Sequence, residues 1–176
     1  MNCDAGEFRL GMRRLAAGVT IITSEHEGEC MGMTATAVCS LTASPPRLLA
    51  CVNLQGSTYR LICGSRRLAV NVLGSSHESV ARDFSRPGKR SPDLFDAGIW
   101  DLAAGSPVLK GALAAFRCSV AHMLLMETHA IVIGEVESVA LGPSQPPLLY
   151  ADGHYGELSP SLPLSVTSNS PFRRTA

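Results

Sequence analysis

Apolar and β-branched residues fall in short runs along this chain, and glycine, proline or charged residues close each run. The segment 19–24, "VTIITS", is representative, because it is β-branched and the polar stretch "EHEGE" follows it. Such runs bounded by turn residues predict strands. We expect about seven of them, over 19–24, 32–44, 47–54, 67–74, 112–124, 129–141 and 147–158. The last one contains a tight turn at Asp152-Gly153.

The N-terminal segment 4–17 has helical rather than strand spacing. Phe8, Met12 and Leu15 fall near one face of a helix, and Asp4 is suited to cap its start. We expect a short amphipathic helix here.

Two further segments favour helices. The first covers 57–65, with Ser57 as the expected N-cap. The second covers 76–85, where Ser76 and Ser79 are both candidate caps.

Many short strands with few helices predict a mainly β fold, in which a closed or partly closed barrel carries peripheral helices. A Rossmann domain is not expected, because the chain lacks a βαβ pattern with GxGxxG. No repeat or linker divides the sequence, so residues 1–158 are expected to form one domain. Residues 159–176 are rich in serine and proline, which predicts a flexible tail.

Charge and hydropathy narrow the function classes. The formal net charge is zero, and no basic stripe for nucleic acid is present. No apolar run reaches the roughly 18 residues that a membrane span needs. The polar N-terminus also lacks the apolar core of a signal peptide. We therefore expect a cytoplasmic protein that binds neither nucleic acid nor membranes.

The six cysteines form no CxxC pair and stand among apolar or small residues. This favours reduced thiols over disulfides or a zinc site. The five histidines show no HExxH spacing, so no metal is expected. The sequence contains no GxSxG motif, which presents the serine nucleophile in many hydrolases. Composition alone does not exclude a Ser/His/Asp triad.

The stretch 32–46, "GMTATAVCSLTASPP", is uncharged and has a hydroxyl at almost every second position. Taken alone, this pattern is more typical of a half-buried structural strand. Its surroundings add a second interpretation, since "CVNLQGST" (51–58) leads into a helix start, where free backbone N–H groups favour a phosphate. A small, neutral strand beside a phosphate site fits a flat heterocycle such as a flavin.

Several long segments in family order resemble the flavin reductase family with the FMN-binding split β-barrel. They span about residues 7–158 and include "FRLGMRRLAAGVTIITS", "GMTATAVCSLTASPP", "RLLACVNLQGST", "PVLKGALAAFRCSV" and "LLYADGHYGEL". The resemblance is strongest to the short-chain reductase components of two-component flavin monooxygenases, of the 4-hydroxyphenylacetate 3-monooxygenase reductase type.

The resemblance implies a set of cofactor-binding residues. The residues expected along the isoalloxazine edge are Met33, Thr34, Ala35, Thr36 and Ala37, and those near the ribityl chain are Cys39 and Ser40. The other side of the flavin is expected to contact Cys51, Val52 and Asn53. The phosphate is expected near Ser57 and Thr58, and Phe84 is expected to approach from the following helix.

Three further residues follow from the resemblance. Many members carry a Gly-Asp-His triplet whose histidine is associated with the nicotinamide cofactor, and this chain reads Glu127-Thr128-His129. His129 is thus the candidate catalytic residue, and Glu127 in place of glycine is a departure that implies an altered loop or an altered preference between NADH and NADPH. His154 and Tyr155 match a flavin-proximal C-terminal strand, which often acts across a dimer interface.

The predicted function is an NAD(P)H-dependent flavin reductase. A homodimer uses NADH or NADPH to reduce FMN or FAD, by hydride transfer from nicotinamide to flavin N5, and supplies the reduced flavin to a partner monooxygenase. Two alternatives remain open at this stage. One is a flavin store or sensor without turnover. The other is an FMN-dependent oxidase on the same barrel, which needs basic residues for a substrate phosphate, and Arg82 and Arg117 are unassigned.

Overall fold

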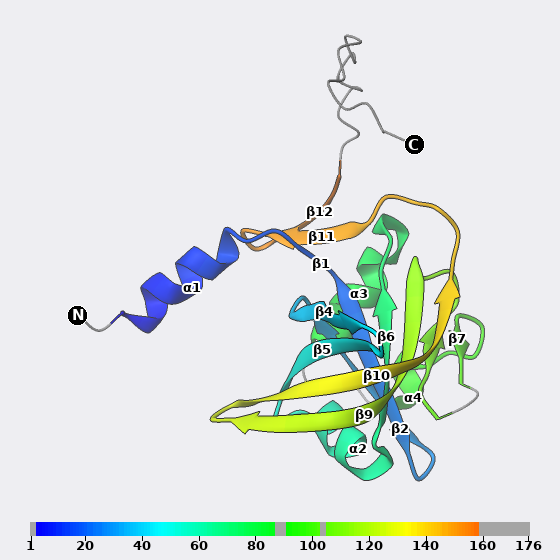
Figure 1. The fold of residues 1–176 in the computed structure, drawn as a ribbon. Helices are drawn as coiled ribbons and strands as arrows, with labels where there is room; N and C mark the ends of the chain where they lie inside the picture. The colour runs from blue at the N-terminus through cyan, green and yellow to red at the C-terminus, as the bar shows by residue number, and fades with distance from the viewer. Residues whose placement is uncertain (1–2, 87–90, 103–104, 159–176) are drawn as a thin grey trace, which may run out of the picture.

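The computed structural model describes residues 3–86, 91–102 and 105–158. Its main element is one antiparallel sheet with the strand order β3-β2-β6-β9-β10-β5-β4 (Figure 1). In chain order these strands are β2 (Thr20–His26), β3 (Glu29–Ala35), β4 (Val38–Ala43), β5 (Pro46–Asn53), β6 (Arg67–Val72), β9 (Ala114–Met126) and β10 (His129–Leu141).

The sheet curls around a single apolar core and so forms a barrel. Alternate residues of its strands point inward, as Val132 on β10 and its cross-strand partner Ala50 on β5 do, and both are fully buried. The strands β3 and β4 follow each other in the chain but lie at opposite ends of the strand order, so the barrel is split between them. Only Thr36 and Ala37 join the two strands.

Helices and two small sheets surround the barrel. α2 (Ser57–Ser65) packs on β2 and β3, and α3 (Glu78–Ser85) packs on β3. A short 3₁₀ turn (Ser75–His77) precedes α3, and α4 (Ser91–Leu94) follows it. The small sheets are β1-β11-β12 and β7-β8, built from β1 (Ala17–Gly18), β11 (Leu148–Ala151), β12 (His154–Glu157), β7 (Trp100–Asp101) and β8 (Val108–Leu109).

The N-terminal helix α1 (Ala5–Arg13) extends away from the barrel (Figure 1). Asp4 caps it as predicted, since its carboxylate accepts hydrogen bonds from the N–H groups of Gly6 and Glu7. The helix ends four residues earlier than expected. Its last turn is tied to the β11–β12 turn, where the N–H of Asp152 donates to the carbonyl of Arg13 at 2.7 Å.

The mainly β fold and most strand positions are confirmed. The segment 129–141 is one strand with the predicted bounds, and 112–124 is a strand despite its alanines. The predicted strand 32–44 is wrong in one respect, because Thr36 and Ala37 break it into β3 and β4. The predicted turn at Asp152-Gly153 joins β11 to β12, with φ of 50° and 86°.

The predicted helix caps after α1 are wrong. Gly56 caps α2 without any side-chain hydrogen bond, so Ser57 is the first helical residue instead. α3 is capped by His77 rather than by Ser76 or Ser79. The predicted tail, residues 159–176, lies outside the described residues, and the domain boundary at 158 stays a prediction. No helix in the described part of the chain is long and apolar enough to span a membrane.

Candidate functional site

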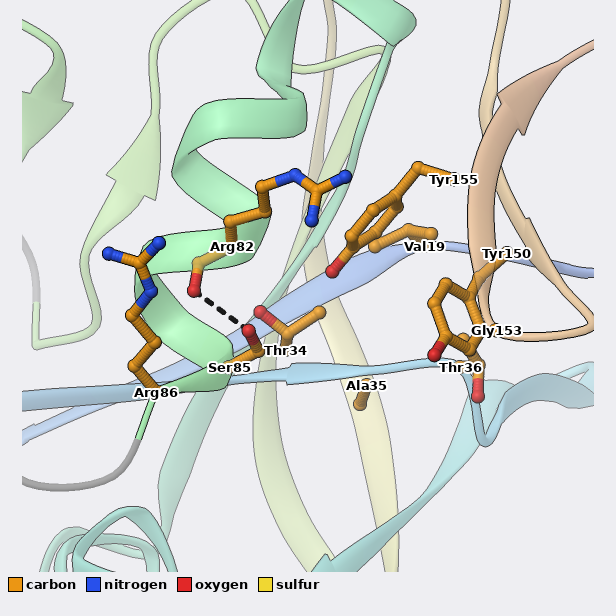
Figure 2. A pocket seen from close by; sticks show the side chains of 10 residues that line it. All are labelled: Val19, Thr34, Ala35, Thr36, Arg82, Ser85, Arg86, Tyr150, Gly153 and Tyr155. Carbon is orange, nitrogen blue, oxygen red and sulfur yellow. Dashed lines mark hydrogen bonds between the residues drawn. The ribbon is translucent and has the colours of Figure 1, made fainter.

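A hollow of about 390 Å³ lies where the end of β3, the last turn of α3 and the β11–β12 hairpin meet (Figure 2). We call it the tyrosine hollow, because Tyr150 and Tyr155 form one wall, with ring centroids 5.1 Å apart in an edge-to-face arrangement. Its other lining residues are Val19, Thr34, Ala35, Thr36, Arg82, Ser85, Arg86 and Gly153.

Arg82 is held in place on the side of the tyrosine hollow. Its Nε donates to Glu78 Oε1 at 2.8 Å, one helical turn earlier, and its guanidinium lies over the Tyr155 ring, 4.8 Å from the centroid. Burial raises the pKa of the Tyr155 phenol, while the charge of Arg82 opposes that shift. The hollow therefore has a rigid wall that is both aromatic and cationic.

A second hollow, of about 310 Å³, lies where α2 begins, and we call it the helix-start hollow. Asn53 ends β5 here, and its Oδ1 accepts the N–H of Gln55 at 2.8 Å. Because Gly56 caps α2 without a side chain, the first N–H groups of the helix are free to bind a ligand. Lining residues are Met31, Gly32, Met33, Asn53, Gln55, Gly56, Ser57, Thr58, Phe84, Ser85, Arg86 and Leu94.

Thr58 is the unusual polar group of the helix-start hollow. The residue is only 2% exposed, yet it lines the hollow. Its hydroxyl makes no hydrogen bond to another residue in the described part of the chain, and it is not one of the fully buried polar atoms, so it is open to the hollow. The hydroxyl is thus available to a ligand.

The two hollows are parts of one groove. Ser85 and Arg86 line both, and β3 contributes Met31 to Ala35 to the pair. Phe84 can lie against β3 because residue 32 is a glycine, since an added Cβ there would sit 2.6 Å from Phe84 Cε1. We call the combined feature the β3 groove. Its floor is uncharged, and its charged groups come from the end of α3.

The comparisons with known proteins agree with this architecture. Residues 12–159 match the model of the flavin reductase like domain. The chain belongs to the flavin reductase-like family. Among curated relatives, the FMN reductase (NADH) RutF 1 of Methylorubrum extorquens is 39% identical over 165 residues, which cover 92% of this chain and 80% of the relative.

Solved structures of flavin reductases share the fold. The NADH:FAD oxidoreductase SgcE6 of Streptomyces globisporus, in complex with NAD and FAD fragments, is 28% identical with a TM-score of 0.81, covering 89% of this chain and 94% of that one. The styrene monooxygenase flavin reductase of Pseudomonas putida S12 is 25% identical with a TM-score of 0.79, covering 89% and 99%. The predicted family and its split-barrel fold are thereby confirmed.

The residues of this flavin reductase-like chain fit a flavin in the β3 groove. The floor around Ala35 is small and neutral, which lets a planar ring approach the backbone. Thr58 and the uncapped start of α2 offer hydrogen-bond donors for a phosphate. The hydroxyl of Thr34 is less free, because it donates to the carbonyl of Ala81 at 2.6 Å.

Most of the predicted binding residues line the β3 groove, and these are Met33, Thr34, Ala35, Thr36, Asn53, Ser57, Thr58, Phe84 and Tyr155. The other predicted residues lie elsewhere. Cys39 and Ser40 line a separate apolar hollow between β4 and the strands β6, β9 and β10. His154 lines a shallow hollow on the other side of Tyr155.

Four further predicted residues do not line the groove. Val52 is fully buried in the barrel core, so its side chain is out of reach of a ligand there. Cys51 and Ala37 face each other, and the N–H of Cys51 donates to the carbonyl of Ala37. His129 begins β10 directly opposite Asn53, which places it beside a lining residue of the helix-start hollow.

The residues that sequence reasoning missed come from α3 and its C-cap. Arg82, Ser85 and Arg86 all line the groove, with the Arg82 side chain directed toward Tyr155 and the Arg86 side chain on the other side of the helix end (Figure 2). Their i, i+3 and i+4 spacing was visible in the sequence. Arg117, the other unassigned arginine, pairs instead with Asp101 at 2.8 Å.

Proposed function

We propose that this chain is an NAD(P)H-dependent flavin reductase that binds flavin in the β3 groove. The predicted activity and cofactors are borne out by relatives named as NADH-dependent FMN reductases and by a neighbour holding NAD and FAD fragments. The observation that carries the proposal for this chain is the groove itself, which has an uncapped helix start at one end and a tyrosine wall at the other.

The protein supplies binding and alignment, while the two cofactors carry the hydride from nicotinamide C4 to flavin N5. Thr34, Ala35 and Thr36 form the floor under the ring, and Ser57 and Thr58 hold the phosphate of FMN. Arg86 lines both hollows and reaches a phosphate in either one. His129 orients the nicotinamide from the mouth of the helix-start hollow. The relatives' names favour NADH over NADPH.

A homodimer is part of the proposal. Leu49 and Cys51 on β5 lie opposite Ile133 and Ile131 on β10, all on the outer face of the barrel, where they remain partly exposed. Leu124 on β9 continues this face and is 50% exposed. An apolar sheet face of this kind suits a second copy of the chain. The family resemblance implies that His154 and Tyr155 act across a dimer interface.

The proposed acceptor of the reduced flavin is a separate monooxygenase. A neighbour of this chain is named as the flavin reductase of styrene monooxygenase, which supports such a partner. A cytoplasmic location is also proposed. It is supported by the six free cysteines, because thiols persist in a reducing compartment.

Anaerobic stopped-flow mixing of the protein, NADH and a many-fold excess of FMN tests the function. We expect the visible absorbance band of oxidised flavin to vanish for the whole excess. Bleaching of only one equivalent per chain identifies a flavin that stays bound. A flavin that binds without bleaching identifies a store or sensor and overturns the proposal.

A further inference from the structure

The two-residue turn between β9 and β10 consists of Glu127 and Thr128, and it presents His129. The Thr128 hydroxyl lies 2.8 Å from Nδ1 of His129. Within the described part of the chain this is the one hydrogen bond of the His129 ring. Nε2 of the same ring is therefore left for a ligand.

The turn is fixed to the edge of the helix-start hollow. The N–H of Leu54 donates to the carbonyl of Thr128 at 3.0 Å, next to Asn53. Asn53 lines the hollow and faces His129 across the strand pair. The backbone at Asn53 and Leu54, which borders the hollow, thus fixes the position of Thr128 and His129 relative to it.

The glutamate at the first turn position does not disturb this arrangement. Glu127 is not among the described residues with positive φ, so the turn needs no glycine at this position. The expectation that Glu127 alters the loop or the preference between NADH and NADPH stays a prediction. Neither turn residue has a positive φ, so both positions accept residues other than glycine. The second residue, Thr128, hydrogen-bonds the imidazole of His129.

We propose that Thr128 is a positioning residue for His129. Its O–H donates to Nδ1, which selects the tautomer with the proton on Nε2 and leaves that N–H as the donor that would bind the nicotinamide. A ring nitrogen that is bonded on one side has its orientation and its tautomer set by that bond. This inference rests on the proposed function, because it assumes that His129 contacts the nicotinamide.

Thr128→Val removes the hydroxyl and keeps the shape, while Thr128→Ser keeps the hydroxyl. We expect Thr128→Val to raise KM for NADH about fivefold, the effect of one lost hydrogen bond, with KM for flavin unchanged. Thr128→Ser and the neighbouring control Glu127→Ala stay within about twofold of the parent protein. In a His129→Ala background, Thr128→Val has no further effect, because the group it positions is gone.

A second readout needs no cofactor. Nitrogen-15 NMR of the imidazoles, assigned with His129→Ala, is expected to show the Nε2–H tautomer at His129 in the parent and in Thr128→Ser, and a mixture in Thr128→Val. An unchanged tautomer together with an unchanged KM overturns the role of Thr128.

The kinetic outcomes distinguish the role of Thr128, the role of His129 and the reductase activity itself. If His129→Ala raises KM for NADH and Thr128→Val does not, only the inference on Thr128 fails. If His129→Ala leaves KM for NADH unchanged while flavin turnover continues, the reductase stands, but the assigned role of His129 falls and the role of Thr128 falls with it. If the parent protein shows no flavin turnover, the proposed function itself fails.

Discussion

The guanidinium of Arg82 lies over the ring of Tyr155, 4.8 Å from its centroid, and so connects α3 to the C-terminal hairpin. Glu78 holds the same guanidinium from one turn earlier in the helix. Segments more than seventy positions apart in the sequence thereby form one wall of the tyrosine hollow (Figure 2). The wall is held through the aromatic face of Tyr155, which Arg82 covers, and through its phenol hydroxyl, which interacts with Ser85.

Tyr155→Ala is expected to weaken flavin binding about fivefold, because it removes the ring that Arg82 covers and Tyr150 contacts. Isothermal titration with FMN measures the dissociation constant. Tyr155→Phe is the matched control: it keeps the ring and loses only the hydroxyl that interacts with Ser85, so it is expected to weaken binding less than Tyr155→Ala does. An equal loss of FMN affinity in both variants would show that binding depends on the hydroxyl rather than on the ring.

Gly32→Ala is expected to destabilise the fold by about 1–3 kcal/mol, because the added Cβ overlaps the Phe84 ring. That ring has little freedom to retreat, since it packs against Phe95 and Trp100 with centroids 5.2 and 5.3 Å away. Urea unfolding measures the change in the free energy of unfolding.

Two further variants test the cause of that loss. Gly11→Ala adds a methyl group where nothing lies within 4 Å, and it is expected to be neutral or slightly stabilising. Gly32→Ala combined with Phe84→Leu is expected to lose less than the sum of the two single changes. Strict additivity would show that the Gly32 effect does not arise from this contact.

Thr58→Val separates cofactor binding from stability. Since the hydroxyl has no partner among the described residues and is open to the hollow, we expect the free energy of unfolding without flavin to change little. The affinity for FMN is expected to fall about tenfold, whereas riboflavin, which lacks the phosphate, is bound unchanged. Equal losses for FMN and riboflavin would place the phosphate away from Thr58.

Cys118 gives a pH-dependent prediction. Burial in the barrel core, with a smaller contribution from the charge of Glu137, raises the pKa of its thiol from 9.0 to about 12. Because the unfolded chain loses this proton first, the free energy of unfolding is expected to decrease as the pH rises from about 9 toward 12.

Two measurements check the Cys118 prediction. The alkaline loss of stability is expected to be smaller in Cys118→Ala than in the parent, when both are unfolded in urea at several pH values. In native protein at neutral pH, iodoacetamide is expected to modify the exposed Cys39 and Cys63 and to spare Cys118. Early alkylation of Cys118 would contradict both its burial and its raised pKa.

The sequence predicted those features that depend on neighbouring residues. The strand 129–141 has a continuous alternating pattern, and its bounds are as predicted. The break at Thr36 and Ala37 was not predictable, because the alternation of small and hydroxyl residues continues through it. The break arises from tertiary structure, since these two residues cross from one edge of the split barrel to the other.

The site was predicted unevenly for the same reason. Thr36 and Thr58 were found from motifs within one segment, and they do line the β3 groove. Arg82 and Arg86 were not, although their helical spacing was visible, because nothing in the sequence shows that α3 packs on β3. Cys39 was placed near the flavin, but the crossing between β3 and β4 turns it toward another hollow.

Trp100 is the only tryptophan of the chain and is 1% exposed. Its ring packs against Phe84 at a tilt of 53°, and Phe84 lines the helix-start hollow, so the indole lies one aromatic residue away from the proposed flavin site. Indole emission overlaps flavin absorption, and energy transfer over such a short path is efficient. In the absence of NADH, which absorbs in the same range, quenching of this indole is therefore expected to report flavin binding without any label.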